Sequence, residues 1–114
     1  MGEGGGGPCA GPLAEHVPRR VVPTRAAENH VFVAYANFPH EQNLHNNPHY
    51  LPFCGASAVV GPDGVDLARG PTNAAQLLVA TVDFAPHHEL LARNPYWHDR
   101  RPELYQELLR ASRA

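Results

Sequence analysis

The tetrapeptide GPDG at residues 61–64 separates two short apolar runs and restricts the fold more than any other feature of the chain. Pro62 fixes φ at the first central position of a tight turn, and Gly64 accepts a positive φ. The flanking runs, residues 55–61 and 65–69, are rich in Ala, Val and Leu. We therefore predict a β-hairpin made of these two strands.

Two further runs have the length and composition of strands. Residues 31–36 read VFVAYA, which is short, β-branched and aromatic. Residues 76–83 read QLLVATVD and are apolar at consecutive positions through LLVA. Because successive side chains of a strand point to opposite faces, we expect this second run to be covered on both sides.

Prolines indicate where helices begin. We predict that residues 14–29 form a helix interrupted near Pro18 and Pro23, with a regular part over 24–29. A second helix is expected after Pro86, over 87–93, because Asn94-Pro95 then breaks the pattern. Pro102 opens a last helix through Arg110, with Leu104, Leu108 and Leu109 on one face.

The order of elements is helix, strand, hairpin, strand, helix, helix, which indicates an α+β fold with a mixed sheet and flanking helices. The first 12 residues contain four consecutive glycines, so we expect a flexible lead-in before a domain over 13–114. The chain has 114 residues, enough for one small domain.

Charge and hydropathy exclude several classes of protein. The net charge is −2 with neutral histidines, and no basic stripe indicates a nucleic-acid partner. No apolar run reaches the roughly 18 residues that a membrane span needs. The N-terminus lacks the pattern of a signal peptide, so we expect a cytoplasmic protein with no membrane partner. Two cysteines do not form a disulfide framework, and we expect both to be reduced thiols.

Three histidines, His40, His45 and His49, lie close together in the polar loop 39–52. Imidazole is a common ligand of zinc, copper and nickel, so metal binding is one interpretation. The loop has no rigid turn or helix to hold the ligands, and a solvated His-rich loop is the interpretation we favour. We accordingly assign no metal and no cofactor.

Two other segments invite a chemical interpretation. Cys54 lies in FCGAS beside a predicted strand, with no helix N-terminus or cation to activate it, so we expect a small buried residue. DRRPELY at 99–105 places Glu103 in the first turn of a helix, which favours a salt-bridged cap. A subunit contact is the alternative, since Arg and Tyr are favoured at interfaces.

Taken in order, these motifs resemble the C-terminal part of the nitrilase, or carbon-nitrogen hydrolase, superfamily. The motifs are RAAEN followed by VFVAYAN, then F-x-G-x-S, GPDG, LLVATVD and DRRPELY. Each motif is weak alone, but six in one order are fairly specific, and together they cover residues 8–109. The loop 39–52 departs from the commonest family pattern, in which a glycine closely follows the asparagine.

The resemblance implies a fold and a chemistry. Members of the superfamily form an α-β-β-α sandwich, usually pair through helices, and hydrolyse nonpeptide C–N bonds of nitriles, amides or carbamoyl compounds. They use a Glu base, a Lys that stabilises charge and a Cys nucleophile. This chain contains no Lys, and neither Cys has the family's surroundings, so no catalytic residue is carried over.

The residues that match the family's motifs are therefore assigned to scaffold and interface. We expect Glu28 to be a buried carboxylate that holds the helix end to the sheet through Arg25 or backbone donors. The full set of matching positions is Arg25, Glu28, Asn29, Asn37, Gly55, Ser57, Arg101, Pro102 and Tyr105.

Three hypotheses for function follow. The first is a partial nitrilase- or amidase-like hydrolase that is inactive alone and partnered by a missing N-terminal portion of the same fold or by a second copy. The second is a non-catalytic scaffold protein derived from that fold, and the third is a small His-rich metal-binding protein. Because a half-sandwich would expose apolar faces, we expect marginal stability and no cooperative thermal transition above about 50 °C.

Overall fold

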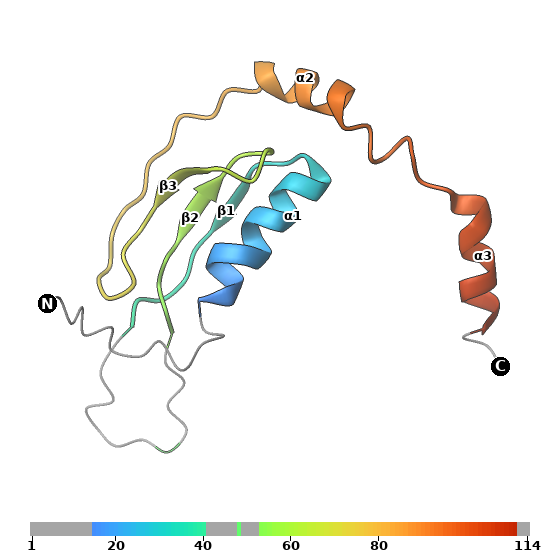
Figure 1. The fold of residues 1–114 in the computed structure, drawn as a ribbon. Helices are drawn as coiled ribbons and strands as arrows, with labels where there is room; N and C mark the ends of the chain where they lie inside the picture. Colours follow the sequence, from blue (N-terminus) through green and yellow to red (C-terminus); the bar gives the residue numbers. More distant parts are fainter. Residues whose placement is uncertain (1–14, 41–47, 49–52, 112–114) are drawn as a thin grey trace, which may run out of the picture.

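The computed structural model describes residues 15–40, 48 and 53–111. A single π-helical turn leads into the first α-helix, three short strands form one sheet, and two helices follow (Figure 1). In chain order the elements are η1 (Val17–Val21), α1 (Val22–Asn29), β1 (Val33–Tyr35), β2 (Ala58–Val60), β3 (Asp66–Arg69), α2 (Ala85–Arg93) and α3 (Pro102–Ala111).

The chain runs helically from η1 into α1 without the interruption expected at its two prolines. Pro18 lies in the first helical turn, where a missing N–H removes no hydrogen bond, whereas Pro23 lies inside the continuous helical run, directly after the π-helical turn η1. The helix ends at His30, which has a φ of 52° and is left-handed. The N–H of Val31 then donates to the Ala26 carbonyl at 3.1 Å, which closes the helix end.

The three strands form an antiparallel sheet in the order β1-β2-β3. Ala34 pairs with Val59, and Val59 pairs with Ala68, so these three residues share one face. The register between β2 and β3 shifts at Val59/Val60, where a bulge lies. Gly64 has a φ of 81° and donates its N–H to the Gly61 carbonyl at 2.9 Å, as a tight turn requires.

The core lies between α1 and one face of the sheet. Val22 and Ala26 of α1 pack with Ala58 and Val60 of β2, and all four are at most 7 % exposed. Figure 1 shows α1 lying along this face of the sheet, which forms two layers. Burial of small side chains allows the helix and the sheet to approach closely, and Val33 and Tyr35 of β1 pack against the edge of the cluster.

Several predictions from the sequence are confirmed. The hairpin, its GPDG turn and the last two helices are present, with the helix bounds within two residues of the expected ones and the first hairpin strand beginning three residues later than expected. The combination of helices with a sheet also agrees with the α+β expectation, but both strand pairs of the described sheet are antiparallel, so the expected mixed sheet is wrong for the described residues. The described residues form one helix layer on one sheet layer, so the four-layer sandwich stays a prediction.

The predicted strand at 76–83 is wrong. This segment belongs to no sheet of the described structure. It runs as an extended connection from the end of β3 toward α2 (Figure 1). Apolar β-forming side chains are therefore insufficient to form a strand when no neighbouring strand is available to share its hydrogen bonds.

The last helices stand away from the sheet. Figure 1 shows α2 beyond the end of the sheet and α3 farther along the chain, apart from both α1 and the strands. Tyr96, between α2 and α3, stacks on the buried ring of His30 with 4.9 Å between ring centroids. The expected lead-in at 1–12 lies outside the described residues. No helix within the described part of the chain is long and apolar enough to cross a membrane.

Candidate functional site

Asn37 and Ser57 form a closed hydrogen-bonded pair just after β1 and just before β2. The Asn37 N–H donates to Ser57 Oγ at 2.9 Å, and Ser57 Oγ donates to the Asn37 carbonyl at 3.2 Å. Asn37 Nδ2 donates to the Gly55 carbonyl at 3.2 Å, and Asn37 Oδ1 accepts from the Phe38 N–H at 3.0 Å. Every polar group of Asn37 is thus engaged, which fits a structural role better than acid–base chemistry.

Gly55 belongs to the same cluster and is there because no other residue fits. Its φ is +50°, and a Cβ at this position would lie 2.6 Å from the Pro71 carbonyl oxygen and 2.8 Å from that of Thr72. Its N–H donates to the Phe38 carbonyl at 2.8 Å. We name Asn37, Gly55 and Ser57 the asparagine knot; the structure brings together these three residues that the sequence matched to the family.

The asparagine knot borders a groove of about 390 Å³. The groove runs between the open face of the sheet, at Ala34 and Val59, and the extended chain at Leu77 and Leu78. Its lining is mainly apolar, which is typical of surfaces that bind a ligand or another part of a protein. Among the residues that line it, none carries a charge.

Arg25, Glu28 and Asn29 lie together on α1 but do not join the knot. Arg25 Nη1 donates to Glu28 Oε1, and Asn29 Nδ2 donates to the Arg25 carbonyl at 2.9 Å. The expected pairing of Glu28 with Arg25 is confirmed. The expectation that Glu28 is buried is wrong, because its side chain is 45 % exposed. Because both partners are on α1, this ion pair lies within the helix and does not connect it to the sheet.

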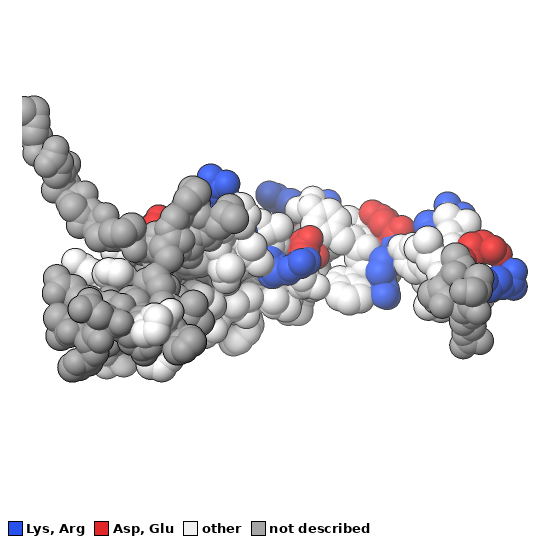
Figure 2. Space-filling view, turned by 90° about the horizontal axis from the view of Figure 1, so that it is seen from below, with Lys and Arg blue, Asp and Glu red and all other residues white. Residues whose placement is uncertain are grey.

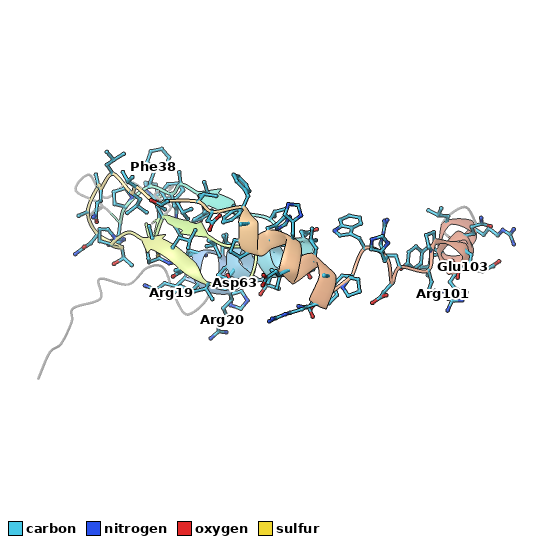
Figure 3. All side chains as sticks on the ribbon, turned by 90° about the horizontal axis from the view of Figure 1, so that it is seen from above. Arg19, Arg20, Phe38, Asp63, Arg101 and Glu103 are labelled. Carbon is cyan, nitrogen blue, oxygen red and sulfur yellow. The ribbon has the colours of Figure 1, made fainter. Side chains whose placement is uncertain are left out.

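Arg101, Pro102 and Tyr105 lie at the start of α3, far from the knot. Figure 3 shows Arg101 and Glu103 side by side there, and the two form an ion pair, so the predicted salt-bridged cap is confirmed. The hydroxyl of Tyr105 also accepts a bond from the Arg101 N–H at 3.4 Å. The matched residues of the sequence thus occupy three separate places: the knot, the end of α1 and the start of α3.

Arg69 is the structural residue that the sequence did not reveal. From β3 its Nη1 donates to the Pro18 carbonyl at 2.6 Å and to the Ala56 carbonyl at 3.0 Å, while Nη2 pairs with Asp66 Oδ1 at 2.6 Å. The hydrogen bond from Arg69, opposed in part by burial, lowers the pKa of the Asp66 carboxyl below its usual value of 3.8. Nothing in the sequence pattern indicated that a strand arginine would reach residues 51 and 13 positions away.

Cys54 is buried, as expected, at 2 % exposure. It is disulfide-bonded in the structure, so the prediction of a reduced thiol is wrong for this residue. The other cysteine, Cys9, lies outside the described residues.

Our interpretation of His40, His45 and His49 as part of a solvated loop, in preference to a metal site, stays a prediction. His45 and His49 lie outside the described residues. Nδ1 of His40 is buried without a hydrogen-bond partner. In the part of the chain that the structure describes, no three His, Cys, Asp or Glu side chains are placed to hold a metal ion.

Charged side chains are distributed without a patch of one sign on the face seen in Figure 2, where basic and acidic groups neighbour each other. Three ion pairs illustrate this mixing: Arg25 with Glu28, Arg101 with Glu103, and Arg110 with Glu107. Exposed pairs of this kind contribute at most about 1 kcal/mol each. Electrostatics therefore does not single out a polyanionic partner.

Comparison with known proteins agrees with the resemblance seen in the motifs. The sequence model of the carbon-nitrogen hydrolase family matches residues 11–90. A protein of Pseudomonas protegens described as a hydrolase in the pqqF 5′ region is 40 % identical over 85 residues. The crystal structure of a carbon-nitrogen hydrolase from Helicobacter pylori superposes with a TM-score of 0.61 at 27 % identity, over 76 % of this chain.

Both relatives are considerably longer. The matched part is 74 % of this chain but 27 % of the Pseudomonas protein, and it is 30 % of the Helicobacter chain. The matched region contains the hairpin, the end of α1 and the asparagine knot. This chain belongs to the carbon-nitrogen hydrolase family.

Proposed function

We propose that this chain is the C-terminal part of a nitrilase- or amidase-like hydrolase, and that it supplies scaffold while the reacting residues come from outside it. In the intact assembly the sheet and α1 would form half of an α-β-β-α sandwich. The partner we favour is the remaining portion of the same fold, in preference to a second copy of this chain.

The asparagine knot is the observation that carries this proposal. It lies within the region matched to the family, borders an uncharged groove, and uses all its polar groups internally. Such a cluster can hold loops at the edge of a pocket but has no free base or nucleophile to offer. The chain also contains no Lys, which the family's chemistry requires.

The implied reaction follows from that family chemistry. A Cys thiolate attacks the carbonyl carbon of an amide, and the Glu takes the thiol proton and passes it to the leaving nitrogen, which gives a thioester. A nitrile first gives a thioimidate, which adds one water and loses ammonia to reach the same thioester. The Lys stabilises the negative charge that develops, and water then hydrolyses the thioester to a carboxylic acid and free Cys. In this proposal all three residues lie on the partner polypeptide.

The test measures ammonia released from short aliphatic amides and nitriles. The chain alone should release none. It should restore turnover when mixed with the remainder of the Pseudomonas hydrolase, produced without its matched 85 residues. Ammonia release by the chain alone would contradict the proposal, and a stable complex that releases none would instead support a non-catalytic scaffold.

A matched pair of variants makes the test specific. Asn37→Ala removes the centre of the knot, so it should abolish the restored turnover. Asn29→Ala removes an amide on α1 that bonds the Arg25 carbonyl, away from the groove, and should retain turnover. Equal loss in both variants would show that activity reports on folding alone and would argue against a positioning role for the knot.

A further inference from the structure

One aromatic stack connects the C-terminal arm, residues 95–111, to the end of α1. The ring of Tyr96 lies on that of His30, with 4.9 Å between the ring centroids and 17° between the ring planes. Among the described residues, the hydrogen bonds and ion pairs of 95–108 all join partners at most four positions apart. Figure 1 shows α3 apart from both α1 and the sheet. The stack is therefore the contact that can fix the direction of the arm.

His30 is an unfavourable residue for its position. It ends α1 with a φ of 52°, in the left-handed region where glycine is the usual residue. Its side chain is only 2 % exposed, and its Nδ1 atom is buried without a hydrogen-bond partner. The Cβ strains the backbone, and the buried nitrogen has lost its bonds to water, so both features oppose folding. Such residues persist only where the surrounding contacts hold them in place.

The contact with Tyr96 accounts for a ring at this position, where a glycine would avoid both penalties. Stacked rings attract each other beyond the effect of the apolar area that they bury. The side chain of Tyr96 is 50 % exposed, so one part of it faces His30 and the rest faces water. Neither residue belongs to the core cluster between α1 and β2. The two rings can therefore separate while that core stays packed.

We propose that His30 and Tyr96 form a latch. When closed, it holds the C-terminal arm in one direction against the end of α1, and when open, it frees the arm while the helix and sheet stay folded. The inference does not depend on the proposed function. Leu104 and Leu108 of α3 are 57 % and 71 % exposed, so the latch sets where this apolar face lies. A segment that is held in advance loses less conformational entropy when it meets another surface.

The chain contains its own probe of the arm. Its one Trp is Trp97, which follows Tyr96 directly. The indole packs on the Arg100 guanidinium, with 4.3 Å between Cζ and the ring centroid. This contact lies within the arm, so opening the latch leaves it intact. The fluorescence anisotropy of Trp97 in the 114-residue chain thus reports the motion of the arm, and in the parent it should be that of a residue rotating with the whole molecule.

Substitutions at Tyr96 open or preserve the latch. In Tyr96→Ala the steady-state anisotropy should fall by at least about a quarter, because a freed segment moves on the nanosecond timescale of the emission. Tyr96→Phe keeps the ring and should keep the anisotropy. The matched control is Tyr105→Ala on α3, whose side chain is 46 % exposed and does not contact His30. It should also keep the anisotropy, and the circular dichroism melt of all three variants should match that of the parent.

A substitution of His30 tests the other half of the latch. His30→Gly removes the ring and relieves the strain at φ, so it should lower the anisotropy as much as Tyr96→Ala does. The double variant should show no further fall, because both residues act through one contact.

The outcomes separate a latch from other roles. A fall in Tyr96→Ala, with the anisotropy retained in Tyr96→Phe and Tyr105→Ala and an unchanged melt, supports it. An unchanged anisotropy in Tyr96→Ala overturns it, as does a parent whose Trp97 moves as fast as in urea. A fall in Tyr96→Ala that accompanies loss of helical signal would make the stack part of the core and would overturn it. A parent anisotropy that falls on dilution would show that a second copy holds the arm, with the same consequence.

Discussion

Replacing Gly55 by Ala tests whether the asparagine knot depends on backbone geometry. Gly55 has a φ of +50°, a conformation that costs a residue with a Cβ about 1–2 kcal/mol. The added methyl would also lie 2.6 and 2.8 Å from two main-chain oxygens, of Pro71 and Thr72. Those same oxygens accept bonds from the Ala56 and His40 N–H groups, at 3.0 and 2.7 Å.

Relief of the overlap therefore requires at least one of these hydrogen bonds to lengthen, at about 1 kcal/mol. Adding this to the conformational cost gives a loss of about 2–3 kcal/mol in the free energy of unfolding. That is a large fraction of the 5–15 kcal/mol typical of a domain. Urea unfolding followed by circular dichroism, extrapolated linearly to water, measures the change.

Gly70→Ala is the matched control. Gly70 is also a buried glycine, but it has no positive φ, and a Cβ there would be in ordinary contact, at 3.5 Å, with the Leu78 methyl groups and the Ser57 main-chain oxygen. It should change stability by less than about 1 kcal/mol. If Gly55→Ala unfolds within about 0.5 kcal/mol of the parent, the knot tolerates a Cβ and the geometric reasoning is refuted.

Three other predictions concern the core and its clamp. Arg69→Met should lower the free energy of unfolding by about 2 kcal/mol, because it leaves the Pro18 and Ala56 carbonyls unpaired. The control Arg110→Met removes an exposed ion pair and should lower it by less than about 0.5 kcal/mol. Equal effects in urea unfolding would contradict a stabilising role for the Arg69 hydrogen bonds. The pKa of Asp66 is lowered in the folded state, so its contribution to the free energy of unfolding is complete above pH 3.8 and is lost as the pH falls through the folded-state pKa. This loss of stability in acid should be absent from Arg69→Met, and its persistence in that variant would argue against the ion pair. Val60→Ala should lower the free energy of unfolding by about 2 kcal/mol, because it opens a cavity at a fully buried site. A Tm equal to that of the parent would show that neighbouring side chains move to fill the cavity and would contradict this prediction.

Local signals predicted most of the described elements. Pro62 and Gly64 define a turn through their own dihedral preferences, and the flanking apolar runs then pair because they are adjacent in sequence. Pro102 likewise marks the start of α3. The family motifs also singled out Asn37, Gly55 and Ser57, which the structure then places together. Each of these inferences depends on interactions within a few residues or on a whole pattern of motifs.

The errors concern properties that depend on distant parts of the chain. Residues 76–83 have strand-forming side chains, but a strand also needs a neighbour, and the described part of the chain places none beside them. Glu28 was expected to be buried because its motif was assigned to scaffold, yet its side chain lies on the outer surface of α1. Cys54 was predicted to be a reduced thiol from the number of cysteines and its local sequence, and neither identifies a disulfide partner.

Local patterns were sufficient to predict the hairpin, the helix starts and the family, because these follow from dihedral preferences, apolar spacing and the order of motifs. Folding was needed to reveal that Arg69 reaches back to Pro18 and Ala56, that Gly55 has no room for a Cβ, and that residues 76–83 pair with no strand of the described structure. The physical reason is that these three facts concern atoms brought together by folding, whose distances no local pattern encodes.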